Sequence, residues 1–313
     1  MKRTIEVSSR GTHLFLRESR IVVEREETTL ASIPVEDLGM VILGTTGVTI
    51  SSGVLKALGT SGGVILACDD THHPCGLFLP LDGNALHGER VRFQAAASLP
   101  LKKNLWANIV RAKIRNQAHL ITEPACRNQL EMMAEKVRSG DEGNAESQAA
   151  RIYWIKLFEK FPRAVAPPFH RYRHGAPPNN LLNYGYAVLR AATARALCIA
   201  GLHPAIGLHH RNRYNGFCLA DDLMEPFRPY IDREVLGLVA TGSLELNKDS
   251  KASIIGSLMR EVTLKGESTV LAIAVERSAS SLAKAIEEQV KNRGSAVDAA
   301  DLLILPQESG PCH

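Results

Sequence analysis

Cysteine is scarce in this chain, which has six cysteines among 313 residues. A small fold held by disulfides needs a much higher density, so that class is excluded. No apolar run of about 7–15 residues follows the basic start, so we expect no secretory signal. The most apolar window, residues 191–208, is interrupted by Arg195 and His203, whereas a membrane helix needs about 20 mostly apolar residues. We therefore expect a soluble, cytoplasmic protein without a membrane partner.

The chain also lacks an extreme hydrophobic or charged fraction. Hydrophobic residues make up 45% of the chain and charged residues 22%, which excludes a disordered chain, a collagen-like chain and a coiled-coil rod. The length suits two domains or one large one. The formal net charge of +4 is too small on its own to indicate nucleic-acid binding.

One pair of cysteines lies near two histidines. Cys68 and Cys75 flank His72 and His73, so this segment could offer zinc a mixed ligand set. Its spacing does not match zinc sites that begin with two cysteines about two to four residues apart. We favour the alternative, a strand end followed by a turn that contains Pro74.

Hydrophobic periodicity divides the chain into two parts. Period-two, β-rich segments predict strands at residues 4–8, 13–17, 20–24, 40–43, 48–50 and 64–66, and a short helix at 52–58. Beyond a turn-rich stretch, a period of about 3.6 residues predicts helices at 101–120, 128–138, 145–161, 180–200 and 268–290, and a short helix or turn at 219–227. The prediction is a multidomain α+β fold, with a β-rich domain (1–82), a linker (83–100) and an α-helical domain (101–313).

Charge is concentrated in the middle of the chain. Residues 101–230 contain 19 Lys and Arg and 10 Asp and Glu, a local net charge of +9, whereas the remainder carries −5. Residues 161–220 contain seven arginines and no carboxylate. Because guanidinium groups pair bidentately with phosphate, this pattern favours a polyanionic partner. The alternative is a solvated basic face that binds nothing.

The few acidic residues in the basic region could hold a cation. Asp222 and Glu225 are three residues apart and share one face of a helix, and Asp221 could do so with Glu225. A divalent ion that binds phosphate would explain acids beside arginines. Taken alone, Glu146 could be an exposed first-turn acid, and His210 a histidine at a helix end or in the core.

Three ordered motifs carry a resemblance to a known family. They are Pro177-Pro-Asn-Asn-Leu-Leu-Asn-Tyr-Gly-Tyr186, Gly207-x-x-His210, and Leu219-x-x-Asp222-Leu-x-Glu225-Pro-Phe-Arg-Pro. In these motifs the chain resembles the CRISPR-associated integrase of spacer acquisition, the catalytic subunit of the adaptation complex. It looks closest to the type II version, and the resemblance covers nearly the whole chain.

The resemblance implies a fold and a metal site. The fold is a β-sandwich-like N-terminal dimerisation domain followed by an all-α catalytic domain, assembled as a homodimer. The catalytic residues and ligands for Mg²⁺ or Mn²⁺ are Glu146, His210 and Glu225, with Asp222 as a further metal-site acid. The Gly-x-x-His frame favours His210 over His209, and the Leu-x-x-Asp frame favours Asp222 over its neighbour. Some relatives have Asp where this chain has Glu225.

The resemblance also implies an activity and partners. The 3′-hydroxyl of a short foreign DNA attacks a phosphodiester of the CRISPR repeat, so both duplexes are partners, together with a small ferredoxin-like protein in a hetero-hexamer-like complex. DNA-binding candidates are Lys102, Lys103, Arg111, Arg115, Arg171, Arg173, Arg211 and Arg213. Two alternatives stay open, a metal-dependent nuclease for branched DNA in repair and a non-catalytic DNA scaffold.

Overall fold

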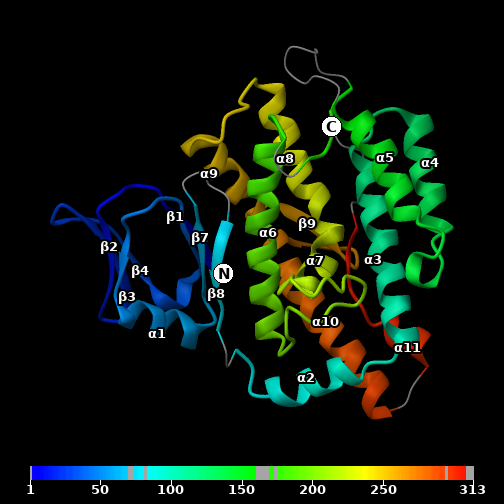
Figure 1. Ribbon diagram of the computed structural model, residues 1–313, viewed down its shortest axis with the longest axis horizontal. Helices are drawn as coiled ribbons and strands as arrows, with labels where there is room; N and C mark the ends of the chain where they lie inside the picture. Colours follow the sequence, from blue (N-terminus) through cyan, green and yellow to red (C-terminus); the bar gives the residue numbers. More distant parts are fainter. Residues whose placement is uncertain are drawn as a thin grey trace.

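The computed structural model describes residues 2–69, 74–80, 83–159, 169–172, 175–292 and 295–307. The chain forms a β-rich part that leads into a larger helical part (Figure 1), so the predicted mixed α+β class is confirmed. The elements of the β-rich part are β1 (Arg3–Val7), β2 (Thr12–Arg17), β3 (Arg20–Arg25), β4 (Thr28–Pro34), η1 (Val35–Asp37), β5 (Leu38–Leu43), β6 (Thr49–Ile50), α1 (Ser52–Ser61), β7 (Val64–Cys68) and β8 (Pro74–Phe78).

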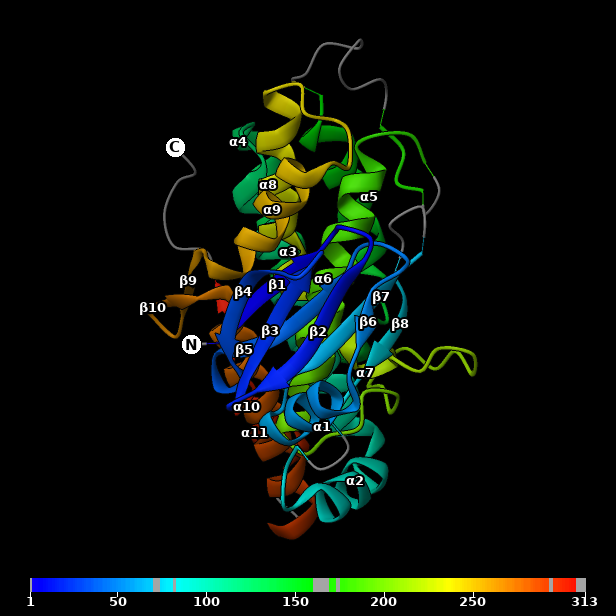
Figure 2. The same ribbon diagram turned by 90° about the vertical axis from the view of Figure 1, so that its left-hand side faces the viewer.

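These strands form two four-stranded sheets. The outer sheet has the order β4-β3-β2-β6, and the inner sheet has the order β1-β5-β7-β8. Figure 2 looks onto the outer sheet, and Figure 1 shows the inner sheet between it and the helices. In the inner sheet β1, β5 and β7 are parallel, and β8 is antiparallel to β7.

The central strands of the inner sheet, β5 and β7, are buried on both faces, which explains their nearly continuous apolar runs. Along β5, Val41 packs into the core between the two sheets, whereas Met40 and Ile42 belong to the core of the helical part. β7 repeats this alternation, with Ile65 toward the outer sheet and Leu66 toward the helices. One sheet therefore joins the two parts of the molecule.

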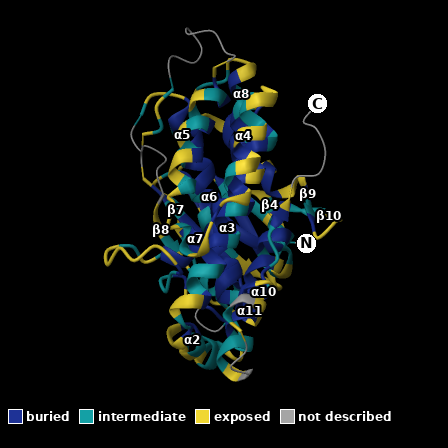
Figure 3. Cartoon of the chain, turned by 90° about the vertical axis from the view of Figure 1, so that its right-hand side faces the viewer, coloured by how far each residue is buried: buried dark blue, intermediate teal, exposed yellow. Residues whose placement is uncertain are grey.

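Helices dominate the remainder of the chain. They are α2 (His87–Ala96), α3 (Leu99–Leu120), α4 (Pro124–Glu135), η2 (Ser139–Asp141), α5 (Ala145–Leu157), α6 (Asn179–Ile199), α7 (Cys218–Met224), η3 (Glu225–Phe227), α8 (Arg228–Ala240), α9 (Lys248–Gly256), η4 (Ser257–Met259), α10 (Leu271–Asn292) and α11 (Ala296–Ala300). The central helices α3 and α6 are largely buried, whereas α4, α5 and α8 carry exposed faces (Figure 3).

The segment expected to be a linker, residues 83–100, contains helix α2. Gln94 of α2 is 1% exposed, and its side chain donates hydrogen bonds to the carbonyl oxygens of His203 and Ile206 at 3.0 and 2.8 Å. Arg90 donates to the carbonyl oxygen of Ala200 at 2.9 Å. These contacts fix α2 against the loop that follows α6, so the segment is part of the packed helical region.

The expectation of an all-α second domain is wrong in one place. β9 (Glu261–Leu264) lies between β10 (Glu267–Val270) and β11 (Pro306–Gln307) in a small antiparallel sheet. Lys265 and Gly266, which connect β9 to β10, have φ of 52° and 81°, as a two-residue type I′ hairpin turn requires. The hairpin takes up residues 268–270, so α10 begins at Leu271, later than predicted.

Buried polar contacts also cross between the two parts. Lys251 Nζ of α9 lies 3.2 Å from Glu6 Oε1 of β1, and both side chains are at most 10% exposed. Arg195 of α6, whose side chain is 10% exposed, donates to the carbonyl oxygen of Gly62 at 2.7 Å. Breaking such buried contacts leaves uncompensated charge, which strongly favours one arrangement of the two parts.

The predicted strand end is confirmed at Cys68, but Pro74 begins strand β8 instead of lying in a turn. Cys68 ends β7 and Cys75 lies in the antiparallel strand β8, whereas His72 and His73 lie outside the described residues. Burial raises the pKa of the Cys68 thiol to about 12, which disfavours the thiolate that zinc binds. Across the described ranges, no helix is both long and apolar enough to span a membrane.

Candidate functional site

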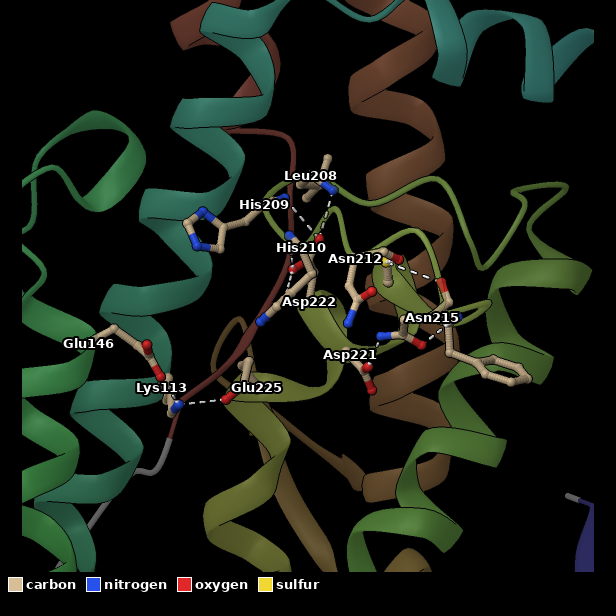
Figure 4. A network of polar contacts seen from close by, with 12 residues as sticks. Lys113, Glu146, Leu208, His209, His210, Asn212, Asn215, Asp221, Asp222 and Glu225 are labelled. Atoms are coloured by element: carbon tan, nitrogen blue, oxygen red, sulfur yellow. Dashed lines mark hydrogen bonds and ion pairs between the residues drawn. The ribbon is translucent and has the colours of Figure 1, made fainter. Parts of the chain in front are cut away.

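Two predicted site residues meet at one buried lysine. Lys113 lies in α3, and its side chain is 7% exposed. Its Nζ atom lies 2.5 Å from Glu146 Oε1 of α5 and 2.5 Å from Glu225 Oε2 of η3 (Figure 4). Three elements that are distant in sequence therefore converge on one ammonium group.

Local structure places each carboxylate. Asp141 accepts hydrogen bonds from the backbone N–H groups of Ala145 and Glu146 at 2.8 and 3.0 Å, and so holds the start of α5. Glu225 stands where α7 gives way to the 3₁₀ turn η3. Pro226 follows it and has no N–H to continue the helical hydrogen bonds.

The charges around Glu225 are balanced. Burial favours its neutral form, but Arg228 and Lys113 outweigh burial and lower the pKa of Glu225. Arg228 contacts the second oxygen of Glu225 at 3.0 Å. Burial alone would lower the pKa of Lys113, whereas Glu225 and Glu146 raise it. Lys113 and Arg228 therefore favour the ionised form of the buried Glu225 carboxylate.

Asp222 organises the loop that carries His210. Asp222 is fully buried, and its Oδ2 accepts the N–H groups of Leu208 and His209 at 2.7 and 3.0 Å. Its Oδ1 accepts the N–H of His210 at 3.2 Å and lies 2.5 Å from His210 Nδ1 (Figure 4). The hydrogen bond to Asp222 outweighs burial and raises the pKa of His210. Because both oxygens serve this loop, these contacts favour Asp222 as a positioning residue, and a direct ligand role stays a prediction.

The two ambiguous neighbours have other partners. The His209 ring stacks on Trp106 of α3, with ring centroids 4.3 Å apart and an interplanar angle of 6°. Asp221 pairs with Arg190 of α6 at 2.6 Å and accepts a hydrogen bond from Asn215 at 2.7 Å. The motif spacing favoured His210 over His209 and Asp222 over Asp221, and the two favoured residues are the ones that pair with each other.

The predicted DNA-binding residues do not form a single track. Lys102 and Arg211 are close enough for Arg211 to help burial lower the pKa of Lys102, so α3 and the His210 loop share a basic patch. Arg111 is nine residues after Lys102 and therefore about half a turn away around α3. Arg111 and Arg115 line a separate hollow with Asp301 and Gln307. Lys103 pairs with Glu142 at 2.9 Å.

The other predicted DNA-binding arginines differ in how many protein groups they contact. Arg171 donates to Asn179 at 3.0 Å and to Asn183 at 2.7 Å, which fixes it to the start of α6. Arg173 lies outside the described residues. Arg213 is exposed, hydrogen-bonds to Tyr214 and lies 4.6 Å from its ring centroid. With His210 and Arg211, it lines a hollow of about 470 Å³.

The donor atoms of the predicted ligands suit the predicted metals. Glu146 and Glu225 offer carboxylate oxygen and His210 offers imidazole nitrogen, a set that accepts Mn²⁺, and carboxylates also suit Mg²⁺. Within the described part of the chain, no three His, Cys, Asp or Glu side chains are gathered as around an ion. Lys113 stands between the two carboxylates instead.

Sequence patterns placed Lys113 only in a basic run that could hold the DNA backbone, and connected neither Lys113 nor Arg228 with the carboxylates. Lys113 belongs to a basic run, but it lies on the apolar face of α3, seven residues after the buried Trp106. A lysine on the buried face of an amphipathic helix was the available signal, since lysine is almost never buried without a partner. Its partner residues could not be identified without the fold.

The sequence matches one family and curated relatives. Residues 5–265 match the family model described as CRISPR associated protein Cas1. A CRISPR-associated endonuclease Cas1 from Neisseria meningitidis serogroup C is 35% identical over 285 residues, covering 89% of this chain and 90% of the relative. The resemblance inferred from the ordered motifs is therefore confirmed.

Solved structures share the fold at low sequence identity. A casposase bound to integration product has a TM-score of 0.77 and 17% identity, with 95% of this chain and 93% of that chain covered. A Cas6-RT-Cas1–Cas2 complex has a TM-score of 0.75 and 18% identity, and the match covers 92% of this chain and 35% of that longer chain.

Proposed function

The chain belongs to the family of the CRISPR-associated protein Cas1, and from this membership we propose that it is a metal-dependent DNA integrase with endonuclease activity. It inserts short foreign DNA fragments into a CRISPR array. The observation that carries the proposal is the convergence of Glu146 and Glu225 on one buried point beside the His210–Asp222 pair. The casposase with the same fold is bound to an integration product, which supports strand joining as the chemistry.

The proposed reaction exchanges one phosphodiester for another. The 3′-hydroxyl of the incoming DNA attacks a phosphorus atom at the edge of the repeat, a new O3′–P bond forms, and the repeat strand leaves with its own 3′-hydroxyl. No nucleotide is consumed, because the number of phosphodiester bonds is unchanged. Catalysis then depends on in-line positioning and on stabilising charge at phosphorus.

Each site residue has a role in this scheme. Glu146, His210 and Glu225 would hold Mg²⁺ or Mn²⁺, which when bound would supply Lewis acidity at the phosphate and favour deprotonation of the attacking hydroxyl. Asp222 accepts the Nδ1 hydrogen bond and leaves Nε2 of His210 free to act as a ligand. Arg228 keeps Glu225 ionised.

The basic patch formed by Lys102, Arg211 and Arg213 is the proposed contact to the DNA backbone beside the site. A charged patch of this kind positions phosphate without reading sequence. We also propose homodimerisation through the β-rich part. A small ferredoxin-like Cas2 protein is the proposed partner, in agreement with the Cas1–Cas2 complex that shares this fold.

A strand-joining experiment tests the function. Wild-type protein, with its partner protein added, is incubated with a labelled short duplex that has free 3′-hydroxyls and with a repeat-containing duplex. Denaturing gels are run after incubation with Mg²⁺, Mn²⁺ or chelator. We expect a longer labelled strand only with metal, and we expect His210→Ala to abolish it while leaving fold and dimer intact. His209→Ala is the matched control, because it removes ring contacts with Trp106 and His210, each worth about 1 kcal/mol, and keeps the backbone N–H that Asp222 accepts.

Each other result points to another function. Joined product from His210→Ala would remove this residue from the site. Metal-dependent cutting without joining would favour the nuclease for branched DNA. Equal DNA binding with metal or chelator, with no product in either case, would favour the scaffold.

A further inference from the structure

Both oxygens of Glu225 already have a cationic partner. Oε2 lies 2.5 Å from Lys113 Nζ, and Oε1 lies 3.0 Å from Arg228 Nη2. The side chain of Glu225 is 5% exposed, so water cannot replace either partner freely. A divalent ion that binds Glu225 must therefore share an oxygen with one of these cations or displace it.

Lys113 occupies the position between the carboxylates. The same Nζ atom contacts Glu146 and Glu225, so an ion that bridges those two oxygens at about 2.0–2.2 Å would overlap the ammonium group. The absence of an ion-like cluster among the described His, Cys, Asp and Glu side chains agrees with this reading. Either the lysine moves or the two carboxylates cannot be ligands of one ion.

Of the two cations, Lys113 is the one built to move. Its ammonium is a compact charge on a flexible four-carbon stem, whereas the guanidinium of Arg228 is planar and rigid. Arg228 is also restrained, because it lies 4.7 Å from the ring centroid of Tyr186. Arg228 can stay and neutralise one charge of Glu225 while the lysine leaves.

We propose that Lys113 is a placeholder cation that holds Glu146 and Glu225 together in the metal-free site and is displaced when a divalent ion binds. This inference rests on the proposed function, which assigns both carboxylates to the metal. Without a cation, two carboxylates this close repel one another and destabilise the fold. The lysine therefore keeps the ligands ordered, and it makes metal binding a competition.

Because Lys113 competes with the metal ion, its removal should increase metal affinity. Lys113→Met should bind Mn²⁺ about tenfold tighter than wild type or more, because the competing buried ion pair is gone. The metal-free variant should melt at a lower temperature, and Mn²⁺ should raise its melting temperature by more than it raises that of wild type. Free Mn²⁺ is measured by electron paramagnetic resonance without DNA, and melting is followed by circular dichroism. If Lys113→Met does not fold, Lys113→Gln replaces it, because the glutamine amide keeps two N–H donors. This variant should also bind Mn²⁺ more tightly than wild type.

Two control variants make the result specific. Lys156→Met removes another lysine that bridges two carboxylates, Glu123 at 3.1 Å and Glu159 at 2.8 Å, and should leave Mn²⁺ affinity unchanged. His210→Ala should weaken Mn²⁺ binding, which shows that the signal reports this site. If wild type binds no Mn²⁺, or His210→Ala binds it normally, the proposed metal site fails. If His210→Ala weakens binding but the Lys113 variants bind no tighter than wild type, only the placeholder inference is overturned.

Discussion

Asp232 is a buried carboxyl group held between two tyrosines. It lies in α8 and is 1% exposed, and its side chain accepts hydrogen bonds from Tyr153 of α5, at 2.7 Å, and from Tyr186 of α6. Burial raises its pKa to about 6, although the two hydroxyl groups and nearby Arg228 and Arg171 act in the opposite direction. Three helices of the site region therefore meet at a group whose charge is costly.

Asp232 should make stability fall as pH rises from about 4 to about 6. In that window the folded protein keeps a proton that the unfolded chain has lost, so the free energy of unfolding decreases with pH. A shift of about two pKa units corresponds to about 3 kcal/mol at most. Asp232→Asn cannot titrate and should lack this component. Urea unfolding of both proteins at several pH values measures it, and parallel pH profiles would contradict the assignment.

The family resemblance predicted which acidic residues belong to one site, but not every partner of those residues. Glu225 lies in one of the ordered motifs and Glu146 is implied by the resemblance, and the structure brings both to Lys113. Lys113 is 33 residues before Glu146 and shares no local pattern with it. Its side chain becomes a site residue only through the packing of α3 against α5 and η3, which a single sequence does not encode locally.

The loop between α6 and α7 is held by close packing around Gly207. A Cβ atom at this position would lie 2.4 Å from the carbonyl oxygen of His210, 2.9 Å from Cys218 Cβ and 3.0 Å from Asp222 Oδ2. The first distance is to backbone and cannot be relieved by a side-chain rotation. Glycine at position 207 therefore lets the loop fold back over the Asp222 carboxylate.

Gly207→Ala should displace His210 and slow strand joining by about tenfold to a hundredfold, since small displacements of positioned groups have effects of this size. Gly216→Ala is the matched control in the same loop, because its Cβ would have nothing within 4 Å. The initial rate of joined product is measured for both variants, with melting temperature as a check on folding. Equal rates would mean that close packing at Gly207 does not set the position of His210.

In the β-rich part, strands with local signals were predicted, whereas two edge strands were not. β4 ends at Pro34, β8 begins at Pro74, and each lies at the edge of its sheet. Proline is tolerated at such edges because no ladder hydrogen bond is lost there, but in sequence it indicates a turn. The central strands β5 and β7 are buried on both faces and were predicted from their apolar runs.

The net charge of the chain is not spread evenly along the sequence. The net +4 combines +9 in residues 101–230 with −5 elsewhere. The basic residues also differ in their availability to DNA. Arg111 and Arg171 hydrogen-bond to protein groups, whereas Arg211 is exposed beside His210. The local positive charge relevant to DNA is therefore smaller than the count of basic residues suggests.

DNA affinity should nevertheless fall steeply with salt, because phosphate contacts release counterions, and Arg211 should contribute to the slope. Each neutralised phosphate adds about 0.9 to the slope of log affinity against log salt concentration. Arg211→Gln should make that slope shallower by about one, whereas Lys284→Gln, on an exposed position of α10 outside the basic region, should leave it unchanged. Fluorescence anisotropy with 3′-blocked DNA, between about 50 and 200 mM salt, measures both variants. A flat wild-type response, or equal changes in the two variants, would show that this patch does not hold the DNA backbone.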